Sequence, residues 1–156
     1  MLVKDIMTQS VKSVNIDTSI MEVSSMMCLY RYSGLPVICE GKLAGLIAEK
    51  DILYHLFPKI EDCFDSLVSI NLDDKVSEFK SVVTLKVADL MTSKVISVSP
   101  DFHILKACAL MVKHKFRRIP VTEDGQLVGM ISLGDVHKAL FQNYVAKSVK
   151  PEAVLG

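Results

Sequence analysis

The sequence SLGD, residues 132 to 135, places a hydroxyl and a carboxylate three residues apart, where a β-rich segment meets a helix-forming one. Ser132 as a helix N-cap with an acid three residues later is a variant of the capping box, in which side chains bond the free N–H groups of the first turn. A carboxylate fixed at such a junction can also accept hydrogen bonds from both hydroxyls of a ribose. Spacing alone leaves Asp135 open to both interpretations.

The sequence AEKD, residues 48 to 51, has the same carboxylate, Asp51, but Ala48 replaces the serine. Half of the capping box is therefore lost while the acid remains. Because alanine has no hydroxyl, the residues fit either a partial helix cap or an incomplete ribose site.

The basic sequence KHKFRRIPV, residues 113 to 121, contains two kinds of position. Residues 113–115 continue a predicted amphipathic helix on its polar side, and we expect them to form a solvated face. Arg117 and Arg118 occupy the turn before a strand that begins at Ile119, and a guanidinium group can bind phosphate through two parallel hydrogen bonds. A single pair of arginines predicts one anionic site rather than an extended nucleic-acid track.

These residues lie in an internal repeat with an offset of 84 positions. Residues 5–57 align with residues 89–141 without a gap, and 18 of the 53 pairs are identical. A match of this length indicates two copies of one structural unit. The two acids are equivalent, whereas the arginines align with Ser33 and Gly34. The fold shared by the copies therefore does not require arginine in that turn.

Each copy predicts the element order β-α-β-β-α. A short strand is expected around residues 11–14 and 95–98, followed by an amphipathic helix with Asp17 or Asp101 as its N-cap. Two antiparallel strands then follow in each copy. The second helices are expected near residues 51–57 and 135–141.

The predicted hairpin turns are Glu40-Gly41 and Asp124-Gly125, because acidic-glycine pairs between β-rich runs favour a two-residue turn. One three-stranded sheet in about 53 residues would expose too much apolar surface to be stable alone. We therefore predict an α+β fold in which the two copies pack through their sheets about a pseudo-twofold axis, with two equivalent clefts.

The predicted organisation has four parts. The repeats occupy residues 1–57 and 88–141, and a connector, residues 58–87, separates them. Apolar spacing in the connector predicts two short helices around a polar break at residues 71–74. A frayed tail is expected at residues 142–156.

Composition restricts the function classes. The chain has 18 basic and 18 acidic residues, so no global charge attracts it to nucleic acid or to an anionic membrane. It has neither a leader sequence nor a membrane-length apolar run, which predicts a soluble cytoplasmic protein. The four cysteines lack metal or redox spacing and are expected to be buried thiols. With no nucleophile, phosphate-loop or metalloprotease motif, no enzyme activity or metal is expected.

Several motifs recur in the same order in both copies: the DIMT-like opening, GLPV or RIPV, and GKLAGLIAEKDI or GQLVGMISLGDV. Together they resemble the CBS domain, and the tandem copies resemble a Bateman module over residues 1–57 and 88–141. The resemblance implies one compact unit of two copies, which commonly dimerises. It also implies inter-repeat clefts that bind AMP, ADP, ATP or S-adenosylmethionine.

The resemblance also assigns residues to parts of the ligand. Ribose binding maps onto Ser132 and Asp135 and, incompletely, onto Asp51, and phosphate binding maps onto Arg117 and Arg118. In many family members the ribose acid and the phosphate contacts come from different repeats, so the arginines could serve either acid. Contacts to the base map onto the threonine of each Met-Thr pair and the positions that follow it, namely Thr8, Val11, Thr92, Val95 and Ile96.

The sequence thus predicts a non-catalytic regulatory module that binds an adenine nucleotide, needs no other cofactor, forms a homodimer and acts on an unidentified protein. The alternative is a structural dimerisation module with empty clefts. Nucleic-acid binding through residues 113–118 is disfavoured by the balanced charge and by the lack of a stacking platform. A membrane is not expected as a partner.

Overall fold

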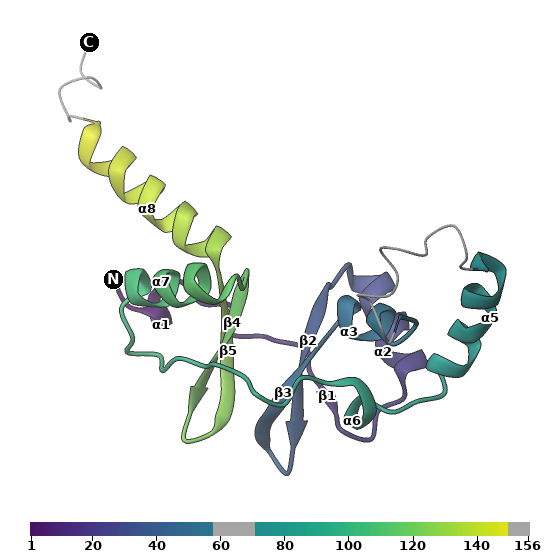
Figure 1. Cartoon of the computed structure of the whole chain (residues 1–156). Coiled ribbons are helices and arrows are strands. Elements are labelled where there is room, and N and C mark those ends of the chain that lie inside the picture. Colours follow the sequence, from purple (N-terminus) through teal and green to yellow (C-terminus); the bar gives the residue numbers. More distant parts are fainter. Residues whose placement is uncertain (58–70, 150–156) are drawn as a thin grey trace. The chain divides into compact units, whose positions relative to one another are not determined.

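The computed structural model describes residues 1–57 and 71–149 (Figure 1). The chain forms two compact units. The first-repeat unit is Lys12–Val95, and the second-repeat unit combines Met1–Val11 with Ile96–Gly156. Each unit therefore contains the hairpin of one repeat together with the Met-Thr segment that opens the other repeat. We define the Met-Thr segments as residues 3–8 and 87–92.

The first-repeat unit contains a three-stranded sheet in the order β1-β2-β3. Strand β1 runs parallel to β2, and β2 runs antiparallel to β3. The described elements are β1 Val14–Asn15, α2 Ile20–Tyr30, β2 Gly34–Cys39, β3 Lys42–Ala48, α3 Glu49–Tyr54, α5 Leu72–Val82 and α6 Val87–Leu90. This order confirms the predicted β-α-β-β-α repeat.

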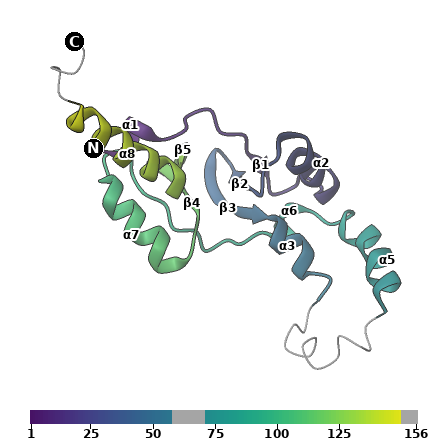
Figure 2. The same cartoon turned by 90° about the horizontal axis from the view of Figure 1, so that it is seen from above.

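The second-repeat unit has the same hairpin, but its first strand is reduced to a single parallel bridge between Val98 and Val121. Helices α1, α7 and α8 gather at this hairpin (Figure 2). The elements are α1 Val3–Ile6, α7 Ile104–His114, β4 Arg118–Glu123, β5 Gln126–Ser132 and α8 Leu133–Ser148. The fold is mixed α+β with two copies of one motif, as predicted.

Both predicted hairpin turns are confirmed. Glu40-Gly41 has φ values of 51° and 77°, and Asp124-Gly125 has 51° and 79°. Two consecutive positive φ values define the type I′ turn, whose twist matches that of the flanking strands. The registers also shift at equivalent positions, after Val37 and after Val121. The two hairpins are thus copies down to this irregularity.

The predicted N-caps are wrong by two residues. Helix α2 is capped by Ser19, whose hydroxyl accepts the N–H of Glu22 at 3.2 Å. Helix α7 is capped by His103, whose Nδ1 accepts the N–H of Leu105 at 3.2 Å. An imidazole nitrogen can accept this bond as an aspartate would, and sequence patterns for N-caps rarely consider it.

The two aspartates that were expected to cap these helices lie near Lys4, in the first Met-Thr segment, and Lys86, directly before the second. Lys4 Nζ lies 2.7 Å from Asp101 Oδ1 and Lys86 Nζ lies 4.0 Å from Asp17 Oδ1. The hydrogen bond to Asp101, followed by the attraction of its charge, raises the pKa of Lys4. Both pairs are exposed, so they contribute little to stability.

Helix α8 is longer than predicted. It was expected to end near Phe141 with a frayed tail behind it, but it continues to Ser148. Residues 142–148 contain neither glycine nor proline, and Tyr144 and Val145 continue the helical spacing of apolar residues. Residues 150–156 lie outside the described part of the chain.

One of the two helices predicted within residues 58–87 is described. It is the second one, α5, which begins after Asn71, and the Asn71 side chain accepts the N–H groups of Asp73 and Asp74. The predicted polar break therefore acts as a helix start. The first predicted helix, near residues 60–67, falls outside the described residues.

The predicted burial of the cysteines is wrong where it can be compared. Cys28 is exposed, and Cys39 and Cys108 are only half-buried. All three are free thiols. Cys63 lies outside the described residues. Their apolar neighbours in the sequence led to the prediction that these thiols are buried, but Cys28 lies on the exposed side of its helix.

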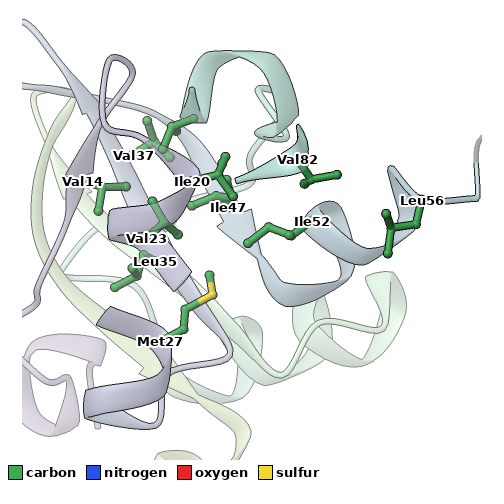
Figure 3. Packing of buried hydrophobic residues seen from close by; sticks show 11 residues of the cluster. Val14, Ile20, Val23, Met27, Leu35, Val37, Ile47, Ile52, Leu56 and Val82 are labelled. Atoms are coloured by element: carbon green, nitrogen blue, oxygen red, sulfur yellow. The ribbon is translucent and has the colours of Figure 1, made fainter. Parts of the chain in front are cut away.

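Each unit has its own hydrophobic core. Figure 3 shows side chains of α2, the sheet and α3 meeting in the first-repeat unit. This core contains Val14, Ile20, Val23, Met27, Leu35, Val37, Ile47, Ile52, Leu56, Val82 and Val87. The second core contains Val3, Val98, Ile104, Ala107, Met111, Ile119, Val121, Ile131, Val136 and Ala139.

The Met-Thr segments contribute an equivalent valine to each core. Val3 and Val87 are both fully buried. The N–H of Val3 donates to Phe102 O at 2.8 Å, and the N–H of Val87 donates to Thr18 O at 2.9 Å. These four residues are related by the 84-residue offset, so each segment docks in the same way.

We predict that Val3→Ala lowers the free energy of unfolding by about 2 kcal/mol, because it removes two buried methyl groups and leaves a cavity. Val76→Ala on α5, where the side chain is 73% exposed, is the matched control and should change it by less than about 0.5 kcal/mol. Urea unfolding followed by circular dichroism measures both. Equal effects would contradict docking of the N-terminal segment in the core.

Candidate functional site

Asp135 lies in the first turn of α8 and forms a complete capping box with Ser132. Its Oδ2 accepts the Ser132 N–H at 2.8 Å and the Ser132 hydroxyl at 2.8 Å. The Asp135 N–H in turn donates to Ser132 Oγ at 3.1 Å. Because Ser132 is also the last residue of β5, the strand and the helix fix the carboxylate together. The capping interpretation is therefore present in the structure, and it employs only one carboxylate oxygen.

Asp51 keeps half of this arrangement. Its Oδ2 accepts the N–H of Ala48 at 2.8 Å. Asp5 and Asp89 make the same bond at the starts of α1 and α6, again without a capping hydroxyl. An acid at this helix position is therefore useful by itself, because it accepts a free N–H and favours the positive end of the helix dipole. Capping alone explains why Asp51 remains where the serine is absent.

Asp51 has a second partner in its own unit. The hydroxyl of Thr92 donates to Asp51 Oδ1 at 3.3 Å. Thr92 is held there by two backbone hydrogen bonds to Leu46, at 2.9 and 3.0 Å. Thr8 makes the equivalent backbone pair with Met130, at 2.9 Å in both directions. The two threonines thus lie at the edges of β3 and β5.

Two glycines permit this close approach. A Cβ added to Gly45 would lie 2.5 Å from Thr92 O, and one added to Gly129 would lie 2.8 Å from Thr8 O. Sequence reasoning gave neither glycine a role. Their signal is a position inside a predicted strand, because a strand-interior glycine commonly marks the close approach of another backbone.

We predict that Gly129→Ala lowers the free energy of unfolding by about 1–3 kcal/mol, because the new methyl group must displace the Thr8 backbone. Gly134→Ala is the control, since its Cβ would meet only Ser132 Oγ at 3.6 Å, and alanine suits a helix better than glycine. Urea midpoints compare the two. A neutral Gly129→Ala would refute the tight segment packing.

The structure separates the predicted ligand residues into two groups. Asp51, Thr92 and Val95 belong to the first-repeat unit. The second-repeat unit holds Thr8, Val11, Ile96, Arg117, Arg118, Ser132 and Asp135. Both threonines are exposed, whereas the predicted base-contacting Val11, Val95 and Ile96 are half-buried.

Arg117 and Arg118 lie beside the start of α8. Arg117 O accepts the N–H of Leu133 at 2.9 Å. Arg118 is the first residue of β4, rather than a turn residue as predicted, and pairs with Ser132 in the sheet register. Both arginines are exposed, and neither forms an ion pair with the described residues. Their guanidinium groups therefore remain available to an anion.

The residues before the arginines contain a feature that sequence reasoning missed. Lys115 caps the C-terminal end of α7 in the left-handed conformation, with φ at 58°. The rings of its two neighbours, His114 and Phe116, stack on each other with centroids 5.6 Å apart. Tyr30 and Tyr32 stack equivalently at 5.7 Å. The left-handed residue brings rings two positions apart onto one side. Sequence reasoning did not predict this stacking of rings within the chain.

No helix of the described residues combines the length and apolarity that a membrane crossing needs. Within residues 1–57 and 71–149, His, Cys, Asp and Glu side chains do not gather in groups of three that could hold a metal ion. At the start of α8 a hydroxyl and a carboxylate meet, and the backbones of Arg117 and Arg118 lie beside this end of the helix.

The family model of the CBS domain matches residues 3–58 and 87–142. The chain therefore belongs to the CBS-domain family and carries the domain twice. An uncharacterized protein of Methanocaldococcus jannaschii is 34% identical over 154 residues, covering 90% of this chain and 91% of that protein. The CBS domain-containing protein YhcV of Bacillus subtilis is 27% identical, covering 86% and 81%.

Solved structures of CBS-pair proteins have the same fold. CBSX2 from Arabidopsis thaliana superposes with a TM-score of 0.74 at 26% identity, covering 92% of this chain and 96% of that one. The crystal structure of CBSX2 in complex with AMP gives a TM-score of 0.70 at 26% identity, with coverage of 92% and 98%. The tandem CBS architecture that the sequence predicted is thus confirmed.

Proposed function

We propose that this protein is a non-catalytic regulatory module that binds an adenine nucleotide. The observation that carries the proposal is the hydroxyl and carboxylate pair at the start of α8, with exposed arginines beside it. A carboxylate suits the ribose hydroxyls, and the arginines suit a phosphate. The AMP complex of CBSX2, a structural relative, supports this ligand class.

The proposed roles follow the chemistry of each group. Ser132 and Asp135 accept the ribose hydroxyls, and Arg117 and Arg118 bind phosphate. Asp51 is the equivalent acid of the other repeat. Contacts to the base are assigned to Thr8, Val11, Thr92, Val95 and Ile96.

Regulation requires that the nucleotide bind one conformation or assembly more tightly than another. The equilibrium then shifts by the difference in the two binding free energies, and a partner protein senses the favoured state. No group needs to break a bond in the ligand for this to work. AMP, ADP and ATP all carry the ribose and phosphate that the proposed residues recognise.

We expect AMP, ADP or ATP to raise the melting temperature of the protein. A ligand at one hundred times its dissociation constant stabilises the folded state by about 2.7 kcal/mol. Arg118→Ala should reduce this stabilisation by removing a phosphate contact, whereas Arg31→Ala, at an exposed position in the other repeat, should not. A thermal-shift series with each nucleotide measures it. No shift at millimolar nucleotide would refute the proposed function.

A second candidate function is a structural dimerisation module without a nucleotide. It is favoured by uncharged, exposed side chains at equivalent positions of two helices: Met21 and Cys28 on α2, and Leu105 and Val112 on α7. Residues seven apart lie on one helix face, so each helix presents an apolar stripe. A homodimer would bury these stripes under either function.

We predict that the protein in solution has twice the 17.3 kDa mass of one chain, and that Leu105→Glu converts it to a monomer by placing a charge in the apolar stripe. Val76→Glu on α5, at a side chain 73% exposed, should leave the dimer intact. Light scattering coupled to size exclusion gives the masses. A monomeric parent protein would exclude the dimerisation module.

A further inference from the structure

Basic and aromatic side chains follow one another in the chain where α7 ends. We define the basic-aromatic turn as residues 113–117, which carry Lys113, His114, Lys115, Phe116 and Arg117. All five are exposed, and none forms an ion pair with the described residues. The turn therefore presents the positive charges of two lysines and one arginine to solvent, with two rings between them.

The acidic side chains of the adjoining hairpin do not cancel these charges. Glu123 and Asp124 lie at the tip of the β4–β5 hairpin, and β4 begins at Arg118. At about 3.3 Å per residue, the tip is roughly 17 Å from the start of the strand. That distance exceeds the Debye length of about 8 Å at physiological ionic strength. Asp135 lies nearer, in the first turn of α8, but it is a single acid beside the cations of the turn and Arg118.

The two rings of the turn are held nearly parallel. The ring planes of His114 and Phe116 differ by 15°, and their centroids are 5.6 Å apart. The left-handed Lys115 between them sets this arrangement, and the Phe116 N–H donates to Met111 O at 2.9 Å. Two rings stacked on each other each keep an outer face. A nucleobase can stack on such a face, because every base has a π surface of its own.

The first repeat shows that the fold does not require the positive charge. Helix α2 also ends at a left-handed residue, Arg31, with φ at 56°, and Tyr30 and Tyr32 stack at 5.7 Å. The last turn of α2 contains no basic residue, whereas that of α7 contains Lys113 and His114. Cations can stabilise the C-terminal end of a helix, but α2 forms the same end without them. The ring pair therefore belongs to both repeats, and the cluster of cations is an addition of the second.

We propose that the basic-aromatic turn binds single-stranded nucleic acid. Lys113, Lys115 and Arg117 contact the phosphates, and unpaired bases stack on the outer faces of His114 and Phe116. An acidic peptide would use the charges alone, and a duplex keeps its bases stacked on one another. The balance of 18 basic and 18 acidic residues describes the whole chain and not this turn. The inference goes beyond nucleotide binding at the start of α8, because the two lysines and Phe116 have no role there.

The test follows the fluorescence anisotropy of a labelled strand of about twelve thymidines as the intact protein is added. The logarithm of the binding constant should fall with the logarithm of salt concentration at a slope of about −2, since each of the three cations contributes about −0.7. Phe116→Leu keeps an apolar side chain but removes the ring, and it should weaken binding at least fivefold. Lys115→Gln should weaken binding and make the slope less steep by about 0.7.

The first repeat supplies the matched controls. Tyr32→Leu and Arg31→Gln change the residues equivalent to Phe116 and Lys115, and each should alter the affinity less than twofold. No anisotropy change at low salt with about 0.1 mM protein would overturn the proposal. So would equally tight binding of the same strand paired with its complement, or equal losses in Phe116→Leu and Tyr32→Leu. The comparison of single strand with duplex uses the unmutated protein, so it decides the point even if a variant does not fold.

Discussion

The structure of both units depends on a backbone approach that only glycine allows. At Gly45 and Gly129, an added Cβ would lie within 3 Å of the carbonyl of Thr92 or Thr8. Without a side chain there, each Met-Thr segment hydrogen-bonds to the hairpin edge. The segment then inserts its valine into the core and places its threonine on the strand that leads to the candidate acid. The packing of each core, the edge of each hairpin and the position of each threonine therefore all depend on glycine at these two positions.

Local chemistry explains which parts of the fold the sequence predicted. An acidic residue followed by glycine specifies a type I′ turn through two adjacent φ values, so both hairpins could be placed correctly. The predicted helix ended too early, near Phe141, because the exposed apolar residues after it were not recognised as a continuation of α8. The assignment of each Met-Thr segment to a unit was beyond sequence reasoning. Two nearly identical hairpins offer identical partners, and pattern alone cannot choose between them.

At the candidate site, residue identity predicts which side chains come together but not the hydrogen-bond partners of each one. Ser132, Asp135 and the arginines were found from their types and spacing, and the structure brings their backbones together. Asp51 looked equivalent because the repeat alignment records side chains and not their partners. Its hydroxyl donor, Thr92, comes from 41 positions away in the chain. In both repeats the acid accepts the N–H group at the start of its helix, so helix capping is the role that the structure shows.

The exchange of opening segments has a consequence for synthesis on the ribosome. The partners of residues 3–8, near Phe102 and Met130, are made about one hundred or more residues after the segment itself. At about 5–20 residues per second, the segment waits for several seconds before it can dock. The first-repeat unit can close as soon as residue 92 has emerged. We therefore expect the first-repeat unit to be complete first, while residues 3–8 dock later.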